Sequence, residues 1–235
     1  GVLCDHSVWA LQSRYLANHG WNVLAIDLPG HCKSGGSAPH SVEEAAQFIE
    51  QLLDAAGLQQ AALIGHSWGS LIAMEAAARL GARISHLALV GTAAPMKVAP
   101  ALLDQALHAP DQAIHLVQTF SRATLAPPSG AGSWVFGAGM ALGRRVQASN
   151  PHTNLLACDR YSNGSHAMAA LACPVLFVLG EQDQMTPAKA ARSLVDAAKA
   201  AGKQVRVEMV PHGHNQMAES PDATLFAIHR FLSAP

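Results

Sequence analysis

The segment Ala61–Leu80 constrains the fold of this chain more than any other stretch. Four apolar residues lead into the motif Gly65–Gly69 (GHSWG), and apolar residues then recur at helical spacing from Leu71 onward. This pattern predicts a strand, a sharp turn and a helix. We expect the two glycines of the motif to be required because Cβ atoms there would clash with neighbouring backbone. Ser67 should then project from the end of a sheet at a helix N-terminus, where free backbone N–H groups favour a developing negative charge and so suit a nucleophile.

Strand-like and helix-like segments alternate on both sides of this motif. Short apolar runs predict strands at Val23–Leu28, Ala61–Ile64, Ile84–Val90, Pro174–Leu179 and Gln204–Val210. Helical spacing and capping residues predict helices at Ser7–Asn18 and from Ser41 to Gly57. Two further helices are predicted after Thr186 and after Ser220, because each of these capping residues is followed by a proline. Because strands that alternate with helices form parallel sheets, we expect an α/β fold with a mostly parallel, doubly wound sheet and helices on both faces.

Residues 93–170 interrupt this alternation. Helices are predicted around Pro100–Leu107 and Asp111–Arg122, followed by a stretch rich in glycine and proline at Ala126–Gly143 and by polar sequence without a clear period. We interpret 93–170 as a helical lid inserted into a core made of 1–92 and 171–235. Its larger apolar side chains could line an acyl pocket or could only pack the lid onto the core; they are Leu102, Leu103, Leu107, Ile114, Val117, Phe120, Trp134 and Phe136.

Composition excludes several classes of protein. The chain has 15 Lys and Arg against 16 Asp and Glu, so its charge favours neither nucleic acid nor an anionic membrane surface. It contains no apolar run of about 18 residues, so no membrane-spanning segment is expected, and we predict a soluble, cytoplasmic protein. The four cysteines lack the spacing of zinc ligands or of a redox pair, so we expect reduced packing residues and no metal or cofactor. No sequence pattern indicates an oligomeric state.

A serine nucleophile needs a base and a carboxylate that orients the base. In a parallel sheet, the loops after neighbouring strands converge at one edge, so candidates should follow strands directly. Asp183 follows the strand predicted at Pro174–Leu179, and His212 and His214 follow the last strand. The chain order Ser, Asp, His is the order expected for a nucleophile elbow in an open α/β sheet.

Each partner has an alternative. Glu181 competes with Asp183 for the role of the orienting acid, and His212 and His214 could instead form part of a metal site, although no nearby ligand supports this. His66 should shape the turn and face away from the serine, because successive side chains of an extended backbone point in opposite directions. We rank His214 first as the base.

At this point the chain resembles the α/β-hydrolase family over nearly its whole length. Besides the motif Gly65–Gly69, the segment Asp27–His31 with Ser34 resembles the family's D-x-P-G-x-G-x-S loop, and Gly180–Asp183 resembles its acid turn. The segment Gly213–Pro221 resembles the family's G-H-x-x-x-x-E-x-P ending, which aligns His214 rather than His212 with the base. Cys32 departs from the family pattern, which has glycine there, so we expect the departure to affect loop geometry.

The same resemblance extends to the beginning of the chain. Gly1 and Val2, followed by Asp5–Trp9, resemble the family's H-G-x loop and its downstream tryptophan. The resemblance implies that the backbone N–H of Val2 is one of two oxyanion donors. The backbone N–H of Trp68 is expected to be the other, because Trp68 lies at the start of a helix. The resemblance also implies a strand before Gly1, lying between the two strands predicted first along the chain. We therefore predict that this sequence is an amino-terminally incomplete piece of a longer protein.

The resemblance implies hydrolysis of a small-molecule carboxylic ester through an acyl-enzyme on Ser67. A serine triad on this fold also serves hydrolysis of lactones, thioesters, amides and carbon–carbon bonds, and cofactor-free peroxidation, and these alternatives stay open. Serine rather than aspartate at position 67 argues against the dehalogenase and epoxide-hydrolase branches. A non-catalytic binding protein on the same fold is a further alternative, against which the presence of all three triad members argues.

Overall fold

The structure is a computed structural model that describes residues 1–123, 131–146 and 151–234, with the side chains of 131–133 left aside. Its sheet consists of four parallel strands in the order β1 (Ala61–His66), β2 (Ile84–Val90), β3 (Val175–Gly180) and β4 (Val205–Val210). Every residue of β3 is buried, as expected for an inner strand covered on both faces. The predicted α/β class and the parallel sheet are confirmed.

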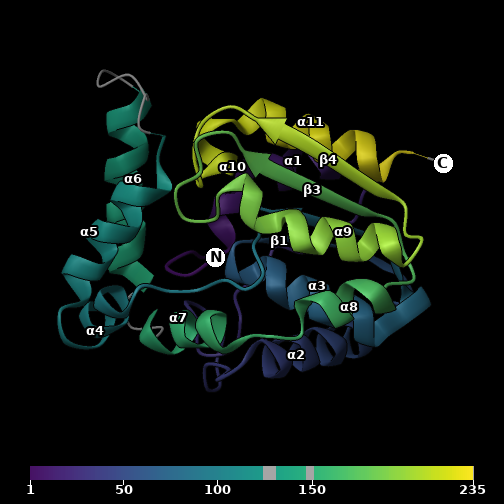
Figure 1. Ribbon diagram of the computed structural model, residues 1–235, viewed down its shortest axis with the longest axis horizontal. Coiled ribbons are helices and arrows are strands. Elements are labelled where there is room, and N and C mark those ends of the chain that lie inside the picture. The colour runs from purple at the N-terminus through teal and green to yellow at the C-terminus, as the bar shows by residue number, and fades with distance from the viewer. Residues whose placement is uncertain (124–130, 147–150, 235) are drawn as a thin grey trace.

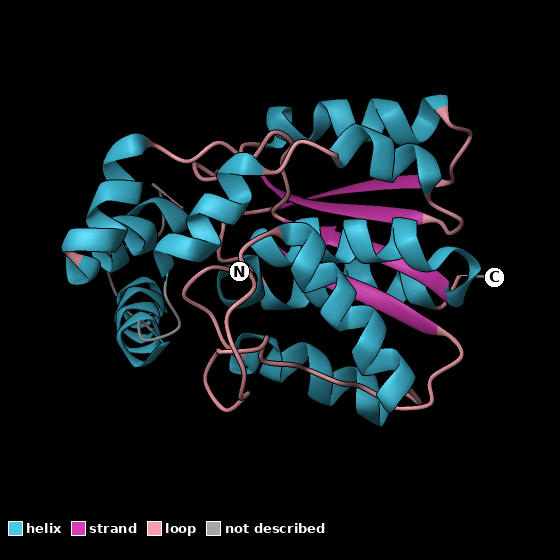
Figure 2. Ribbon diagram, turned by 90° about the horizontal axis from the view of Figure 1, so that it is seen from below, coloured by secondary structure: helices cyan, strands magenta, loops and turns pink. Residues whose placement is uncertain are grey.

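Helices cover both faces of this sheet (Figure 2). On one face, side chains of α2 (Val42–Ala55), α3 (Trp68–Leu80), α8 (Gly164–Ala170) and α9 (Arg192–Ala200) form a core cluster with alternate residues of β2 and β3. On the other face, α1 (Ala10–Asn18) and α11 (Pro221–Leu232) pack against the remaining residues of the same strands. The sheet is therefore doubly wound, as predicted.

The insertion between β2 and β3 contains five helices among the described residues. They are α4 (Pro100–His108), α5 (Pro110–Ser121), α6 (Ala131–Val146), α7 (Pro151–Arg160) and α8. Figure 1 shows α4, α5 and α6 beyond the ends of the strands, apart from the two helical layers. The shorter elements are η1 (His6–Trp9), η2 (Gly81–Arg83), η4 (Ala188–Ala191) and α10 (Gln216–Glu219). Our division places α8 in the lid, whereas Ala167 and Met168 of α8 are buried in the core cluster beside α3 and α9.

The strand predicted at Val23–Leu28 is wrong. The backbone there is irregular, Leu24 is 62% exposed, and β1 forms the edge of the sheet on that side. A strand is defined by hydrogen bonds to a neighbour, and none of the described strands pairs with this segment. An apolar run thus has the composition of a strand without the partner that makes it one.

No helix is predicted in the stretch rich in glycine and proline at Ala126–Gly143, but the structure has one there. Helix α6 begins inside the stretch rich in glycine and continues to Val146. A Cβ atom at Gly139 would lie 2.0 Å from Gln118 Oε1, and one at Gly143 would lie 2.6 Å from Ile114 Cγ2. These glycines let α6 lie close against α5, and this packing outweighs the low helix propensity of glycine.

In the part of the chain that the structure describes, no helix combines the length and the apolar character that crossing a bilayer requires.

Candidate active site

Ser67 lies at a strained turn between β1 and α3. Its φ and ψ are +52° and −122°, and its N–H donates to Val90 O at 2.9 Å. A Cβ atom at Gly65 would lie 2.1 Å from Gly69 O, so only glycine permits the strand and helix to approach this closely. The matching prediction for Gly69 is wrong, because a Cβ atom there would meet nothing within 4 Å beyond its own helical turn.

Asp183 and His214 form a buried pair at the ends of β3 and β4. His214 Nδ1 lies 2.8 Å from Asp183 Oδ2, and the two side chains are 5% and 0% exposed. The carboxylate also accepts hydrogen bonds from the backbone N–H groups of Met185 and Thr186, at 2.9 and 2.8 Å, and from Thr186 Oγ1 at 2.9 Å. A carboxylate held in this way favours the tautomer of the imidazole with the proton on Nδ1, in which Nε2 is the unprotonated nitrogen.

Thr186 was predicted as a helix cap, and this is wrong. The chain after Pro187 first forms η4 without a side-chain cap, and α9 begins only at Arg192. The Thr186 hydroxyl instead contacts both members of the buried pair, since it lies 3.1 Å from His214 Nδ1. Sequence reasoning missed this residue because its role depends on a loop geometry that capping statistics do not describe.

The carboxylate of Asp183 stays ionised in spite of its burial. Burial alone would raise its pKa, but the positive charge that His214 can carry, the hydrogen bond from His214 and those from Thr186 together hold the pKa of Asp183 below its ordinary value. A charged carboxylate beside the imidazole stabilises the imidazolium that forms when His214 accepts a proton.

The competing candidates lie elsewhere. Glu181 is exposed, whereas Asp183 is buried. His212 has a positive φ of +77° and its Nδ1 lies 2.9 Å from Ser220 Oγ, so it faces a different partner from His214. The Ser220 hydroxyl in turn donates to Pro211 O, which explains why it occupies the N-cap position of α11 without capping the helix.

His66, expected to shape the turn, packs against His214, with 4.7 Å between the two ring centroids, and lines the same cavity as Ser67. Its Nε2 lies 2.9 Å from His214 O, which requires Nε2 to carry the proton and donate it. Burial lowers the pKa of His66 well below its ordinary value, as does the nearby charge that His214 can carry, so the ring is neutral and Nδ1 is an acceptor. This Nδ1 is buried and has no hydrogen-bond partner among the residues that the structure describes.

Ser67 and His214 line one cavity of about 290 Å³. Both lie at the end of β2, because the Ser67 N–H donates to Val90 O and a Cβ atom at Gly91 would lie 3.1 Å from the His214 ring. Among the hydrogen bonds of the described residues, none joins Ser67 Oγ to His214. Such bonds often tighten only when substrate binds.

Of the two expected oxyanion donors, Trp68 follows Ser67 in the chain and Val2 lines the same cavity as Ser67. Trp68 is the first residue of α3, so its N–H lies in the unpaired first turn of the helix. Val2 lines the cavity, and a Cβ atom at Gly1 would lie 3.2 Å from Ser67 Cβ. The Trp68 indole packs 5.6 Å from the ring of His31, which links the loop with the D-x-P-G motif to the turn. Cys32 in that loop has a φ of +48°, a conformation that glycine adopts more easily, which accounts for the family preference.

Three of the eight apolar lid residues line this cavity: Leu102, Val117 and Phe120. Ile114 is buried in a helix cluster that Phe136 also contacts, Leu103 packs in a neighbouring cluster, and Leu107 and Trp134 are largely exposed. The sequence did not single out several other lining residues: Met96, Val98, Gln118, Ser121, Leu155, Met185 and Asn215. Most come from loops, Gln118 and Ser121 come from the C-terminal part of α5, and Leu155 comes from the middle of α7.

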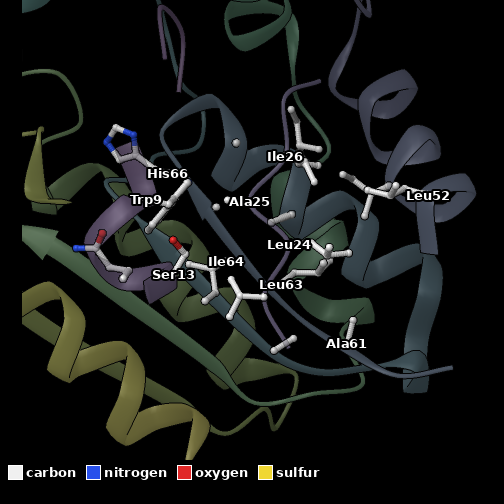
Figure 3. A pocket seen from close by; sticks show the side chains of 18 of the residues that line it. Trp9, Ser13, Leu24, Ala25, Ile26, Leu52, Ala61, Leu63, Ile64 and His66 are labelled. Atoms are coloured by element: carbon white, nitrogen blue, oxygen red, sulfur yellow. The ribbon is translucent and has the colours of Figure 1, made fainter. Parts of the chain in front are cut away.

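A larger hollow of about 800 Å³ lies between the irregular segment Trp21–Leu28 and β1 (Figure 3). Figure 3 shows Leu24 and Ile26 on one side, Leu63 and Ile64 of β1 on another, and Leu52 of α2 beside them. Neither Ser67 nor His214 lines it. We therefore take the smaller cavity as the candidate active site.

Metal ligands do not cluster in this structure. The described residues contain no group of three or more His, Cys, Asp and Glu side chains that could hold a metal ion. His212 and His214, the pair considered from sequence, contact Ser220 and Asp183 respectively. All four cysteines are free thiols, of which Cys158 and Cys173 are buried and Cys32 is exposed.

Comparison with known proteins finds several enzymes that are similar to this chain. The chain is 28% identical over 180 residues to a pimeloyl-(acyl-carrier protein) methyl ester esterase of Neisseria meningitidis serogroup C, which covers 71% of this chain and 67% of that protein. It is 34% identical over 89 residues to bifunctional epoxide hydrolase 2 of Sus scrofa, which covers 36% of this chain but only 16% of that protein. The crystal structure of an enol-lactonase from Burkholderia xenovorans LB400 superposes with a TM-score of 0.86 at 22% identity, over 100% of this chain and 89% of that one.

A family model described as alpha/beta hydrolase fold matches residues 3–127, more than half of the chain. The fold, the turn at Ser67 and this match lead to one conclusion: the chain belongs to the α/β-hydrolase fold family.

Proposed function

We propose that this protein is a serine hydrolase that cleaves small carboxylic esters through an acyl-enzyme formed on Ser67. The observation that carries the proposal is the buried pair of His214 and Asp183, 2.8 Å apart, of which His214 lines the same cavity as the strained Ser67. The similarity to the methyl ester esterase of Neisseria meningitidis supports a carboxylic ester as the bond that is cleaved. Serine at position 67 argues against the direct attack by a carboxylate that epoxide opening on this fold uses.

In the proposed mechanism, Ser67 Oγ attacks the ester carbonyl while His214 Nε2 takes its proton. Asp183 holds the imidazole in the tautomer that leaves Nε2 free and stabilises the imidazolium. The negative charge that develops on the carbonyl oxygen would be bound by the N–H of Trp68, at the N-terminus of α3, and by that of Val2. His214 then protonates the departing alcohol, and a water molecule deprotonated by His214 releases the acid and restores Ser67.

The cavity supports a small, neutral substrate. Its volume of about 290 Å³ lies at the lower limit of ordinary ligand pockets, and most of its wall is apolar. Esters with short acyl chains fit such a volume, whereas long chains would have to displace the insertion helices. We therefore expect kcat/KM for p-nitrophenyl esters to be highest for acetate to hexanoate and to fall steeply at laurate.

A fluorophosphonate probe tests the proposal directly. The wild-type protein should become labelled on Ser67, as peptide mass spectrometry would reveal, and should lose esterase activity in step with labelling. Ser67→Ala should neither react nor hydrolyse esters while it unfolds as cooperatively as the wild type. Labelling of another residue, or an active Ser67→Ala variant, would refute the assignment, and a stable but unreactive wild-type protein would point to a binding role.

A further inference from the structure

The loop that carries His214 is fastened to the insertion as well as to Asp183. The backbone N–H of His214 donates to Ser121 O at 2.7 Å, and that of Asn215 donates to the same oxygen at 3.0 Å. Ser121 is the last residue of α5 and is 2% exposed. The main chain of the candidate base therefore rests on the end of a helix that belongs to the insertion.

A single carboxylate joins the two segments a second time. Glu219, on α10, accepts the N–H of Gly213 at 2.9 Å on one oxygen and the N–H of Ala123 at 3.0 Å on the other. The segments are in close contact, because a Cβ atom at Gly213 would lie 2.6 Å from Ala123 N. Hydrogen bonds from backbone N–H groups to a charged carboxylate are stronger than those to a neutral group.

We propose that Glu219 is a positioning residue that fixes His214 on the end of α5 and thereby makes the placement of the base depend on the insertion. The inference rests on the proposed function, because it assigns Glu219 to the residue that we take as the base. Glu219 does not line the cavity, so it acts through the loop and not on substrate. A displacement of α5 would carry Ser121 O and Ala123 N–H with it, and the hydrogen bonds that hold Gly213 to Asn215 would be lost together.

Variants of Glu219 test the proposal from the side of the acceptor. A misplacement of the base by about 1 Å costs roughly a hundredfold in rate, so Glu219→Ala should lower kcat about tenfold to a hundredfold and leave KM within about twofold. Glu219→Gln keeps one acceptor oxygen and should fall between wild type and Glu219→Ala. Asp222→Asn, which removes a charge from an exposed position three residues further on, is the matched control and should behave as wild type.

Ala123→Pro tests it from the side of the donor. Arg122 is already extended, with φ and ψ of −94° and 156°, which suits a following proline, and proline removes the N–H that Glu219 accepts. If the two residues act through one link, the double variant Ala123→Pro, Glu219→Ala should be little slower than Glu219→Ala alone. Multiplicative losses would show that the two positions act independently and would overturn the proposed coupling.

A readout other than turnover separates this inference from the proposed function. The Nδ1 proton of His214, identified by NMR through its loss in His214→Ala, should be sharp in wild type and Asp222→Asn. It should broaden by exchange in Glu219→Ala and in Ala123→Pro. If the signal in Glu219→Ala stays as sharp as in wild type below the unfolding temperature of the variant, Glu219 does not position the base, whatever the activity of the wild-type protein is.

Discussion

At the scale of single residues, His66 shows how a buried side chain can make the site sensitive to acid. It is fully enclosed, donates from Nε2 to the main chain of His214, and leaves Nδ1 without a partner. Its pKa in the folded protein is well below the ordinary value, mainly because burial disfavours the charged ring. Protonation would place a positive charge against the His214 loop with no group to receive it.

This geometry predicts that stability falls as the pH decreases. An unfolded histidine takes up a proton near pH 6.5 whereas folded His66 does not, so the unfolded state binds more protons below that pH. The free energy of unfolding should therefore decrease from pH 7 to 5, with a contribution from His66 of at most about 1.4 kcal/mol per pH unit. Asp183 contributes little to this change, because folding lowers its pKa and its stabilisation is lost mainly as the pH falls below the ordinary aspartate pKa of about 3.9 and through the lower folded value.

Denaturant unfolding of His66→Asn at several pH values checks this prediction. Asparagine can still donate to His214 O but does not titrate, so the slope of stability against pH should be smaller than in wild type. His40→Asn, at an exposed position, is the control and should keep the wild-type slope. An unchanged slope in His66→Asn would mean that this ring does not govern the acid response.

The sequence predicted which candidate site residues lie together where those residues follow the ends of strands. Ser67, Asp183 and His214 each follow a strand directly, and parallel strands bring such positions to one edge of the sheet. The contacts of Thr186 and Glu219 were not predicted, because their hydrogen-bond partners lie on other segments. Nothing in the local sequence indicates which backbone groups these side chains contact.

At the scale of elements, the turn between β1 and α3 depends on one glycine of its two. Gly65→Ala would press a methyl group onto Gly69 O and should cost about 2 kcal/mol or more in stability, with loss of activity as Ser67 shifts. Gly69→Ala meets open space and lies in α3, so it should be neutral or stabilise the protein by about 0.5 kcal/mol. Urea unfolding of both variants tests the contrast, and equal losses would show that close packing of strand on helix is not the reason for Gly65.

Elements were predictable where local pattern and tertiary partner agree. The strands at Ile84–Val90 and Val175–Gly180 were found because buried parallel strands are continuous apolar runs, and the helix at Val42–Ala55 because Ser41 Oγ accepts from Glu44 N–H. The strand prediction at Val23–Leu28 is wrong because composition does not reveal whether a neighbouring strand is available for pairing. Helix α6 was not predicted, because its glycines allow close packing against α5 and no local sequence signal indicates this packing.

At the scale of the whole molecule, the sheet holds the candidate triad while the insertion forms much of the cavity wall. Leu102 of α4 lines the cavity, whereas Leu107 of the same helix is 57% exposed. Leu102→Ala should enlarge the acyl site and raise kcat/KM for p-nitrophenyl octanoate relative to butyrate by about tenfold, since one or two methylenes in an apolar pocket discriminate on that scale. Leu107→Ala should leave the ratio unchanged, and a shift of equal size there would indicate that α4 influences selectivity without lining the site.

The central claim is that Ser67, Asp183 and His214 act as one chemical unit. It is tested most directly by kcat/KM for p-nitrophenyl butyrate in Ser67→Ala, His214→Ala and the double variant, each checked for cooperative unfolding. In each single variant kcat/KM should fall about 10⁴-fold or more. In the double variant it should fall no more than about a few-fold further, because removing either residue already abolishes the function that the two residues perform together. Losses that multiply, or a His214→Ala variant that keeps most of the wild-type rate, would contradict the account.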